Sequence, residues 1–212
     1  MEFDRLTVFR SERVKRALLV LLFLTTPLLV FPWRFVRSGL LDGGDDALSN
    51  LPLLRHSAEQ LLSLEVLWTP ALWLGTPLLE EPEFATFYLP RLVLLLFEPI
   101  SGFALYVILH YALAQAAMFL LLRVLGLGRP AAVFAALVYG FVGFMIGHRG
   151  HTMYLVAGAW APLFFFFVER ARHRVGRYDY LWAALSFAAL PLSGALQLTA
   201  YLGSAALLVN GV

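Results

Sequence analysis

Several long apolar runs constrain the fold of this chain more than any other feature. The first run, residues 17–36, follows the basic segment 10–16 and is about as long as the roughly 20 residues that a helix needs to cross a bilayer. Further apolar runs occupy residues 101–122, 130–147, 153–168, 180–193 and 195–209. We therefore predict an all-α fold, a polytopic transmembrane helical bundle of about six spans.

The composition agrees with an integral membrane protein. Of the 212 residues, 60% are hydrophobic and only 14% are charged, and the mean hydropathy is +0.77. Soluble domains are about half apolar and about a quarter charged. The net charge of +2 does not indicate a nucleic-acid partner, because arginines of a membrane protein usually report its topology. The absence of cysteine excludes disulfides, thiolate catalysis and cysteine metal sites.

The first apolar run also has an alternative interpretation, since a basic segment before an apolar run is the pattern of a secretory signal peptide. Such a peptide ends at a small-residue cleavage site of the A-x-A kind, and none follows this run. We favour a helix that is retained.

The distribution of basic residues predicts the topology. Eleven of the sixteen Lys and Arg residues lie in three segments: five before residue 17, two in 123–129 and four in 169–179. Because cytoplasmic connections carry an excess of Lys and Arg, we expect these segments, and thus the N-terminus, to be cytoplasmic. Residues 37–99 then form the first extracytoplasmic loop.

That loop carries aromatic residues throughout and is expected to lie close to the membrane. From Ser49 onward it predicts an amphipathic helix, with Ser49 or Asn50 as the cap. The apolar stripe is Leu51, Leu54, Ala58, Leu61 and Leu62, opposite Arg55, His56, Glu59, Gln60 and Ser63. Such a helix either packs on other parts of the protein or lies in the headgroup plane, and both can hold at once.

Five landmarks follow the first run in a characteristic order: "GDDALSN", "LWTPALWLGTPLLEEPEFATFYLPRLVLLLF", "LHYALAQAAMFLLLRVLGLGRPAA", "GFMIGHRGHTMYLVAGAWAPLFFFFVER" and "LSGALQLTAY". Together they resemble the YfhO-like bacterial membrane proteins of the GT-C class of polyprenyl-phosphate-dependent glycosyltransferases. The likeness covers nearly the whole chain from Gly43 onward. Relatives often have a His-Pro pair where this chain has Ala195 and Leu196. The resemblance implies that residues 1–212 form a single GT-C-like transmembrane domain, the N-terminal part of a longer chain.

The densest acid cluster, Asp42, Asp45 and Asp46, lies in the first polar break, "SGLLDGGDDALSN". The resemblance implies that Asp45 and Asp46 are catalytic. A carboxylate there takes the proton from an acceptor hydroxyl, or holds a divalent cation such as magnesium or manganese against the donor phosphate. The sequence does not choose which of the two acts. On the residues alone, Asp-Gly clusters also make turns, and Asp46 is a suitable helix cap.

The segment "GHRGH" contributes His148, Arg149 and His151 to the second outer connection. Two histidines separated by a glycine make a weak metal site, whereas an arginine binds a lipid phosphate through two parallel hydrogen bonds. An interfacial polar turn is the other interpretation. Gln197, in the third outer turn, is a further candidate for substrate binding or for a structural role. His110 lies within an apolar run, which predicts an interhelical hydrogen bond.

Signatures of other chemistries are absent, including the phosphate-binding loop, H-E-x-x-H, G-x-S-x-G and the dinucleotide fingerprint. By resemblance, we expect a glycosyltransferase in the cytoplasmic membrane of a bacterium. It would move a sugar from a polyprenyl-phosphate donor to a cell-surface polymer, glycolipid or protein on the outer face. Its partners would be the lipid bilayer, the lipid-linked sugar and the cell-surface acceptor. The alternative is a non-enzymatic transporter or membrane assembly partner.

Overall fold

The computed structural model describes residues 2–30, 51–70, 74–148, 151–174 and 176–210. The α-helices are α1 (Glu2–Val30), α3 (Leu51–Ser63), α4 (Pro99–Val124), α5 (Arg129–Gly140), α6 (Gly143–Gly147), α7 (Thr152–Arg172), α8 (Asp179–Leu192) and α9 (Leu196–Asn210). Two short 3-10 helices, η2 (Pro82–Phe84) and η3 (Leu89–Leu95), lie between α3 and α4. Within these segments the extended pairing is one antiparallel bridge between Thr69 and Thr76. The all-α prediction is confirmed.

Among the described residues, three segments are long and apolar enough to cross a membrane: Pro99–Val124, Arg129–Gly147 and Thr152–Arg172. The helices α8 and α9 are apolar but shorter, and the 14 residues of α8 extend only about 21 Å along a hydrocarbon core of about 30 Å. The helix α1 contains the first apolar run as far as Val30, and the rest of that run lies outside the described residues. The structure thus has the helices of a membrane protein, and the count of six spans stays a prediction.

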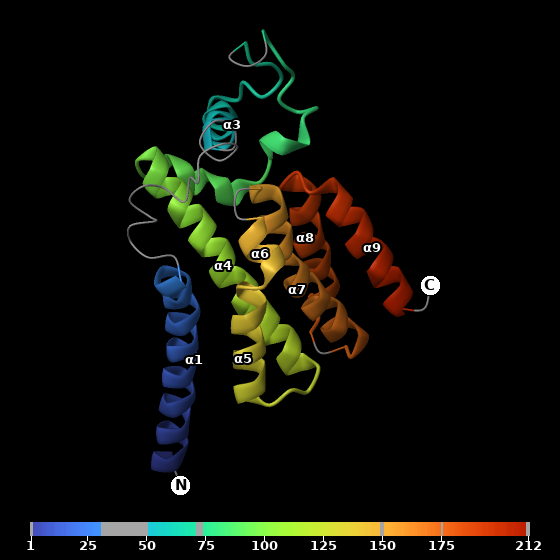
Figure 1. The fold of residues 1–212 in the computed structure, drawn as a ribbon. Helices are drawn as coiled ribbons and strands as arrows, with labels where there is room; N and C mark the ends of the chain where they lie inside the picture. Colours follow the sequence, from blue (N-terminus) through green and yellow to red (C-terminus); the bar gives the residue numbers. More distant parts are fainter. Residues whose placement is uncertain (1, 31–50, 71–73, 149–150, 175, 211–212) are drawn as a thin grey trace.

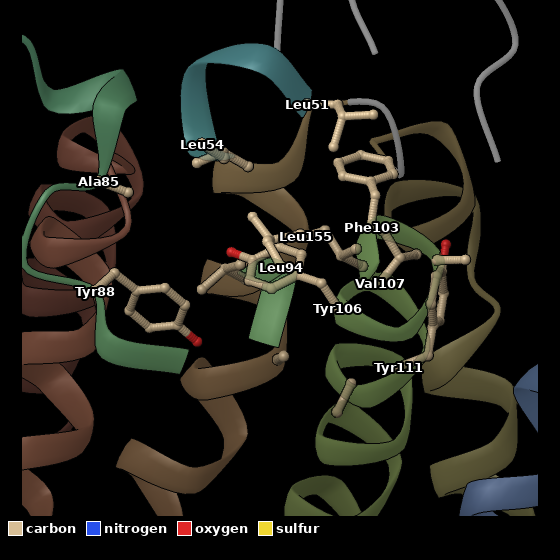
Figure 2. Packing of buried hydrophobic residues seen from close by; sticks show 14 of the residues in the cluster. Leu51, Leu54, Ala85, Tyr88, Leu94, Phe103, Tyr106, Val107, Tyr111 and Leu155 are labelled. Carbon is tan, nitrogen blue, oxygen red and sulfur yellow. The ribbon is translucent and has the colours of Figure 1, made fainter. Parts of the chain in front are cut away.

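The helix α4 lies at the centre of the bundle and packs against α1, α5 and α7, while α7 also packs against α8 (Figure 1). Small buried residues of α4, such as Ala104, Ala114 and Ala117, allow its neighbours to approach closely. Larger side chains fill the core nearer the α3 end, where Phe103, Tyr106 and others meet residues of α7 and η3 (Figure 2).

Two helix irregularities in the bundle are stabilised by tyrosines. Pro162 lies inside α7 and has no N–H to donate to the carbonyl of Gly158, four residues earlier. The hydroxyl of Tyr139 in α5 donates to that carbonyl at 2.7 Å. Similarly, the hydroxyl of Tyr111 in α4 donates to the carbonyl of Met145, in the short helix after the α5–α6 break, at 2.8 Å. Each bond satisfies a main-chain oxygen in the apolar part of the protein, where an unpaired carbonyl is costly.

A buried glutamine connects three helices. The hydroxyl of Thr26 in α1 donates to Oε1 of Gln115 in α4 at 2.7 Å. The same side chain lies against Gly140 of α5, where an added Cβ would be only 2.6 Å from Cγ of Gln115. Glycine at position 140 therefore makes room for the polar contact between α1 and α4.

The three basic segments lie at one end of the bundle. The chain begins at the same end as the α4–α5 and α7–α8 connections (Figure 1), and basic residues occupy the last turns of α4 and α7. Nη2 of Arg129, the first residue of α5, lies 2.7 Å from Oε2 of Glu12 in α1. Hydrogen bonds from Arg129 and from Lys15 lower the pKa of Glu12 to about 2. The end of the bundle that holds these basic segments is called the basic end. The opposite end, where α3 lies, is called the loop end.

The predicted amphipathic helix is present as α3, but its buried face differs from the predicted stripe. Leu51 and Leu54 join the main core (Figure 2). Leu53 packs against Leu78 and Phe84. Of the predicted stripe, Leu61 is only half-buried and Leu62 is exposed. The buried residues of α3 lie between Leu51 and Ala58, and η2, η3 and α4 contact this helix, whereas Leu62 and Ser63 at its end are exposed. Of the two alternatives, packing of this helix on other parts of the same protein is thus observed.

Candidate functional site

A fully buried arginine fixes the connection between α3 and α4 at the loop end. Arg91 in η3 has an exposed fraction of 0%. Its guanidinium donates to the hydroxyl and the carbonyl of Ser57 in α3, at 2.8 and 2.7 Å, and to the carbonyls of Phe84, Ala85 and Thr86. Burial lowers the pKa of Arg91 to about 10, so the group remains charged at neutral pH. The loop is therefore folded around one cation.

Hydrogen bonds among three side chains, those of His110, Tyr88 and Trp160, join this loop to the bundle. Nδ1 of His110 lies 2.7 Å from the carbonyl of Tyr106, which can only accept, so Nδ1 carries the proton. Nε2 of the neutral ring accepts from the hydroxyl of Tyr88 at 2.6 Å, and that oxygen accepts from Nε1–H of Trp160 at 2.7 Å. His110 was predicted to form an interhelical hydrogen bond. It bonds instead to Tyr88 of the loop, and Tyr88 in turn bonds to Trp160 of α7.

A cavity of about 200 Å³ lies between Glu81–Glu83 of the loop, the start of α7 and the α8–α9 turn. Its polar lining residues are Glu81, Glu83, Tyr154 and Gln197. At the turn, Gly194 has φ +93°, and an added Cβ would lie 2.6 Å from the carbonyl oxygen of Pro82. Only glycine allows the turn to approach the loop this closely. A second cavity of about 220 Å³ adjoins the first and shares Glu81, Pro82 and Leu196 with it.

Three of the predicted substrate-binding residues meet around Tyr154. The ring of His148 lies 5.1 Å from the ring of Tyr154, and the ring of His151 lies 6.3 Å from it, measured between centroids. The two histidine rings are 5.9 Å apart. Gln197 lines the same cavity as Tyr154, and its amide donates to the hydroxyl of Tyr201 at 2.8 Å. Residues of the α6–α7 and α8–α9 connections thus lie close together around this cavity.

The other predicted site residues lie outside the described residues. These are Asp45, Asp46 and Arg149, together with Asp42 of the acid cluster. In the sequence, Asp45 and Asp46 precede Leu51, the first residue of α3, by six and five positions. Among the side chains that the structure does describe, no three of His, Cys, Asp or Glu gather closely enough to hold a metal ion.

Several residues of this region were not predicted as functional from the sequence: Tyr88, Arg91 and Trp160, which anchor the loop, and Glu81 and Glu83, which line the cavity. A signal was available for Arg91, since it is the single charged residue in the otherwise apolar stretch "FYLPRLVLLLF". A charge in such a position is costly unless it is paired, which indicates a specific set of partners. The carboxylates in "EEPEF" have no comparable signal, because acids in loops are usually solvated.

Comparison with known proteins does not assign the chain to a family. No protein-family model, curated protein or solved structure matches the chain.

Proposed function

We propose that this protein is a membrane glycosyltransferase of the GT-C class. It transfers a sugar from a polyprenyl-phosphate donor to a cell-surface polymer, glycolipid or protein at the outer face of the bacterial cytoplasmic membrane. The observation that carries the proposal is the cavity at the loop end of an apolar helical bundle, lined by two glutamates, with two histidines beside its lining residue Tyr154. A lipid-linked donor holds its phosphate and sugar at this level, next to the membrane surface.

The charges around the cavity suggest a division of roles. Glu81 and Glu83 would repel a phosphate, so their side of the cavity suits the hydroxyl groups of the acceptor. His148 and His151, with Arg149 between them in the sequence, suit the donor phosphate. Asp45 or Asp46 then supplies the carboxylate that accepts the proton of the acceptor hydroxyl or holds a magnesium or manganese ion.

The proposal requires the loop end to face outward, with about six spans and the N-terminus in the cytoplasm. Because the chain has no cysteine, single cysteines can report this directly. A membrane-impermeant thiol reagent added to intact cells is expected to label Ser63→Cys and Glu65→Cys, which are exposed at the end of α3 or just after it. Val14→Cys and His173→Cys, exposed at the basic end, are expected to stay unlabelled until the cells are opened. The reverse pattern would place the cavity in the cytoplasm and contradict the proposal.

Transfer itself is tested with membranes that contain the full chain and a radiolabelled polyprenyl-phosphate sugar. We expect label in a membrane or cell-surface acceptor, and none with membranes that lack the protein. The double variant Glu81→Gln/Glu83→Gln is expected to lower kcat/KM for the acceptor about tenfold, because hydrogen bonds to charged groups exceed those to neutral ones. Its KM for the donor should not change.

The matched control is Glu65→Gln, which removes a carboxylate at the same end but outside the cavity. If the control and the double variant lower transfer equally, the cavity is not the acceptor site. Absence of transfer by the native protein with every donor sugar supplied would favour the transporter or assembly partner. The break between α5 and α6 within one apolar segment is the observation that favours a transporter, since transporters use discontinuous helices.

A further inference from the structure

The connection between α7 and α8 at the basic end carries an excess of positive charge. Residues 169–179 contain four arginines and two carboxylates. Both carboxylates already have partners. Asp179 is buried and lies 3.0 Å from Nε of Arg170, and Glu169 lies 3.1 Å from Nη1 of Arg172. The ion pairs of the described residues include neither Arg174 nor Arg177.

The geometry of the turn keeps these two arginines at the surface. An added Cβ on Gly176 would lie 2.7 Å from both carboxylate oxygens of Asp179 and 2.8 Å from Nη2 of Arg170. The turn is therefore closed tightly over the buried ion pair. Arg174 precedes this point in a left-handed conformation, with φ 52°, and both Arg174 and Arg177 are exposed.

Exposed aromatic residues adjoin the two arginines. Tyr178, Tyr180 and Trp182 are exposed at the start of α8, and Leu181 and Leu185 continue the exposed apolar face along the helix. Tyrosine and tryptophan are enriched at the headgroup level of a bilayer, with aliphatic residues deeper. The guanidinium of Arg177 also lies over the ring of Tyr178, 5.2 Å from its centroid. This pattern locates Arg174 and Arg177 at the height of lipid phosphates.

We propose that Arg174 and Arg177 form a binding site for the phosphate of an anionic phospholipid such as phosphatidylglycerol. Guanidinium groups bind phosphate oxygens through paired hydrogen bonds, and the aromatic edge supports the glycerol and acyl portions of the lipid. A zwitterionic lipid is disfavoured, because its ammonium group meets a turn with surplus positive charge. The site lies at the opposite end from the cavity and does not depend on the proposed transferase activity.

The test uses the fluorescence of Trp182, which lies at the same edge. The full-length protein in detergent micelles is titrated with brominated phosphatidylglycerol or brominated phosphatidylcholine, and Trp182→Phe protein gives the background of the other tryptophans. Near a membrane surface each Lys or Arg attracts anionic lipid by roughly 1 kcal/mol, which is about fivefold in affinity. We therefore expect phosphatidylglycerol to quench Trp182 at lower concentration than phosphatidylcholine, with about fivefold of this preference lost in Arg177→Gln and nearly all of it in Arg174→Gln/Arg177→Gln.

The control is Arg16→Gln, which removes one exposed charge from α1 at the same end of the bundle. It is expected to keep the preference. Three results would overturn the site: equal quenching by both lipids in the native protein, an unchanged preference in the double variant, or an Arg16→Gln effect as large as that of Arg177→Gln. Displacement of the lipid by excess soluble glycerol 3-phosphate would show a site for a free phosphate group and would likewise contradict a lipid site.

Discussion

Asp45→Asn or Asp46→Asn is expected to lower sugar transfer by the full-length protein about 100-fold to 10,000-fold, the range typical for loss of a general base. Asparagine keeps the size of aspartate but neither accepts the proton nor supplies negative charge to a cation. The measurement is transfer of labelled sugar to the membrane acceptor, at protein levels matched by immunoblot. Expression and membrane insertion should be unchanged.

Asparagine is the informative substitution because it separates catalysis from local structure. It is itself a good turn and helix-cap residue, so a purely structural role of the acid cluster predicts little loss. Asp42→Asn is the control, since Asp42 lies outside the "GDD" landmark of the resemblance. Transfer near the native rate in both the Asp45 and the Asp46 variant would mean that the cluster is an acidic turn without a catalytic role.

Arg91→Met is expected to destabilise the protein by about 3 to 5 kcal/mol, because it leaves a set of buried acceptors without their donor. Arg91→Lys should fall in between, as an ammonium group has three donors in place of the five of a guanidinium. Thermal or denaturant unfolding in detergent measures both effects. The control is Arg16→Met, which removes an exposed arginine and should change stability by less than about 0.5 kcal/mol.

A second measurement tests whether Arg91 specifically holds the loop. Thr86 is buried, so Thr86→Cys should resist thiol labelling in the otherwise native protein and become reactive when combined with Arg91→Lys. This readout is independent of whether Arg91→Met accumulates in the membrane. Unchanged stability together with a thiol that stays protected in the combined variant would show that the hydrogen bonds of Arg91 do not hold the loop in place.

Much of the fold was predictable because it rests on local properties of the chain. A long apolar run forms a helix wherever water is absent, since only internal hydrogen bonds satisfy its backbone. The predicted runs from residue 101 onward accordingly agree with α4 to α9 to within a few residues, except that the run 130–147 is divided into α5 and α6. The clustering of arginines in short connections likewise anticipated that the three basic segments share one end of the bundle.

The buried face of α3 shows where local pattern was not sufficient. Periodicity assigned Leu62 to the apolar stripe, yet Leu62 is exposed, and Ser57, on neither predicted face, is buried under Arg91. Which side of an amphipathic helix is covered depends on the neighbours that reach it. The elements that cover α3 include η2 and η3, which come later in the sequence.

The sequence by itself determined the helices, the grouping of charge at their ends, and the residue types available for phosphate and acceptor binding. The tertiary structure alone decided which of these residues meet. It brought His148, His151 and Gln197 around Tyr154, added Glu81 and Glu83 to the same cavity, and enclosed Arg91 in main-chain carbonyls. The physical reason is that a helix is encoded by neighbours along the chain, whereas these contacts depend on the close approach of segments such as Pro82 and Gly194, which local sequence does not specify.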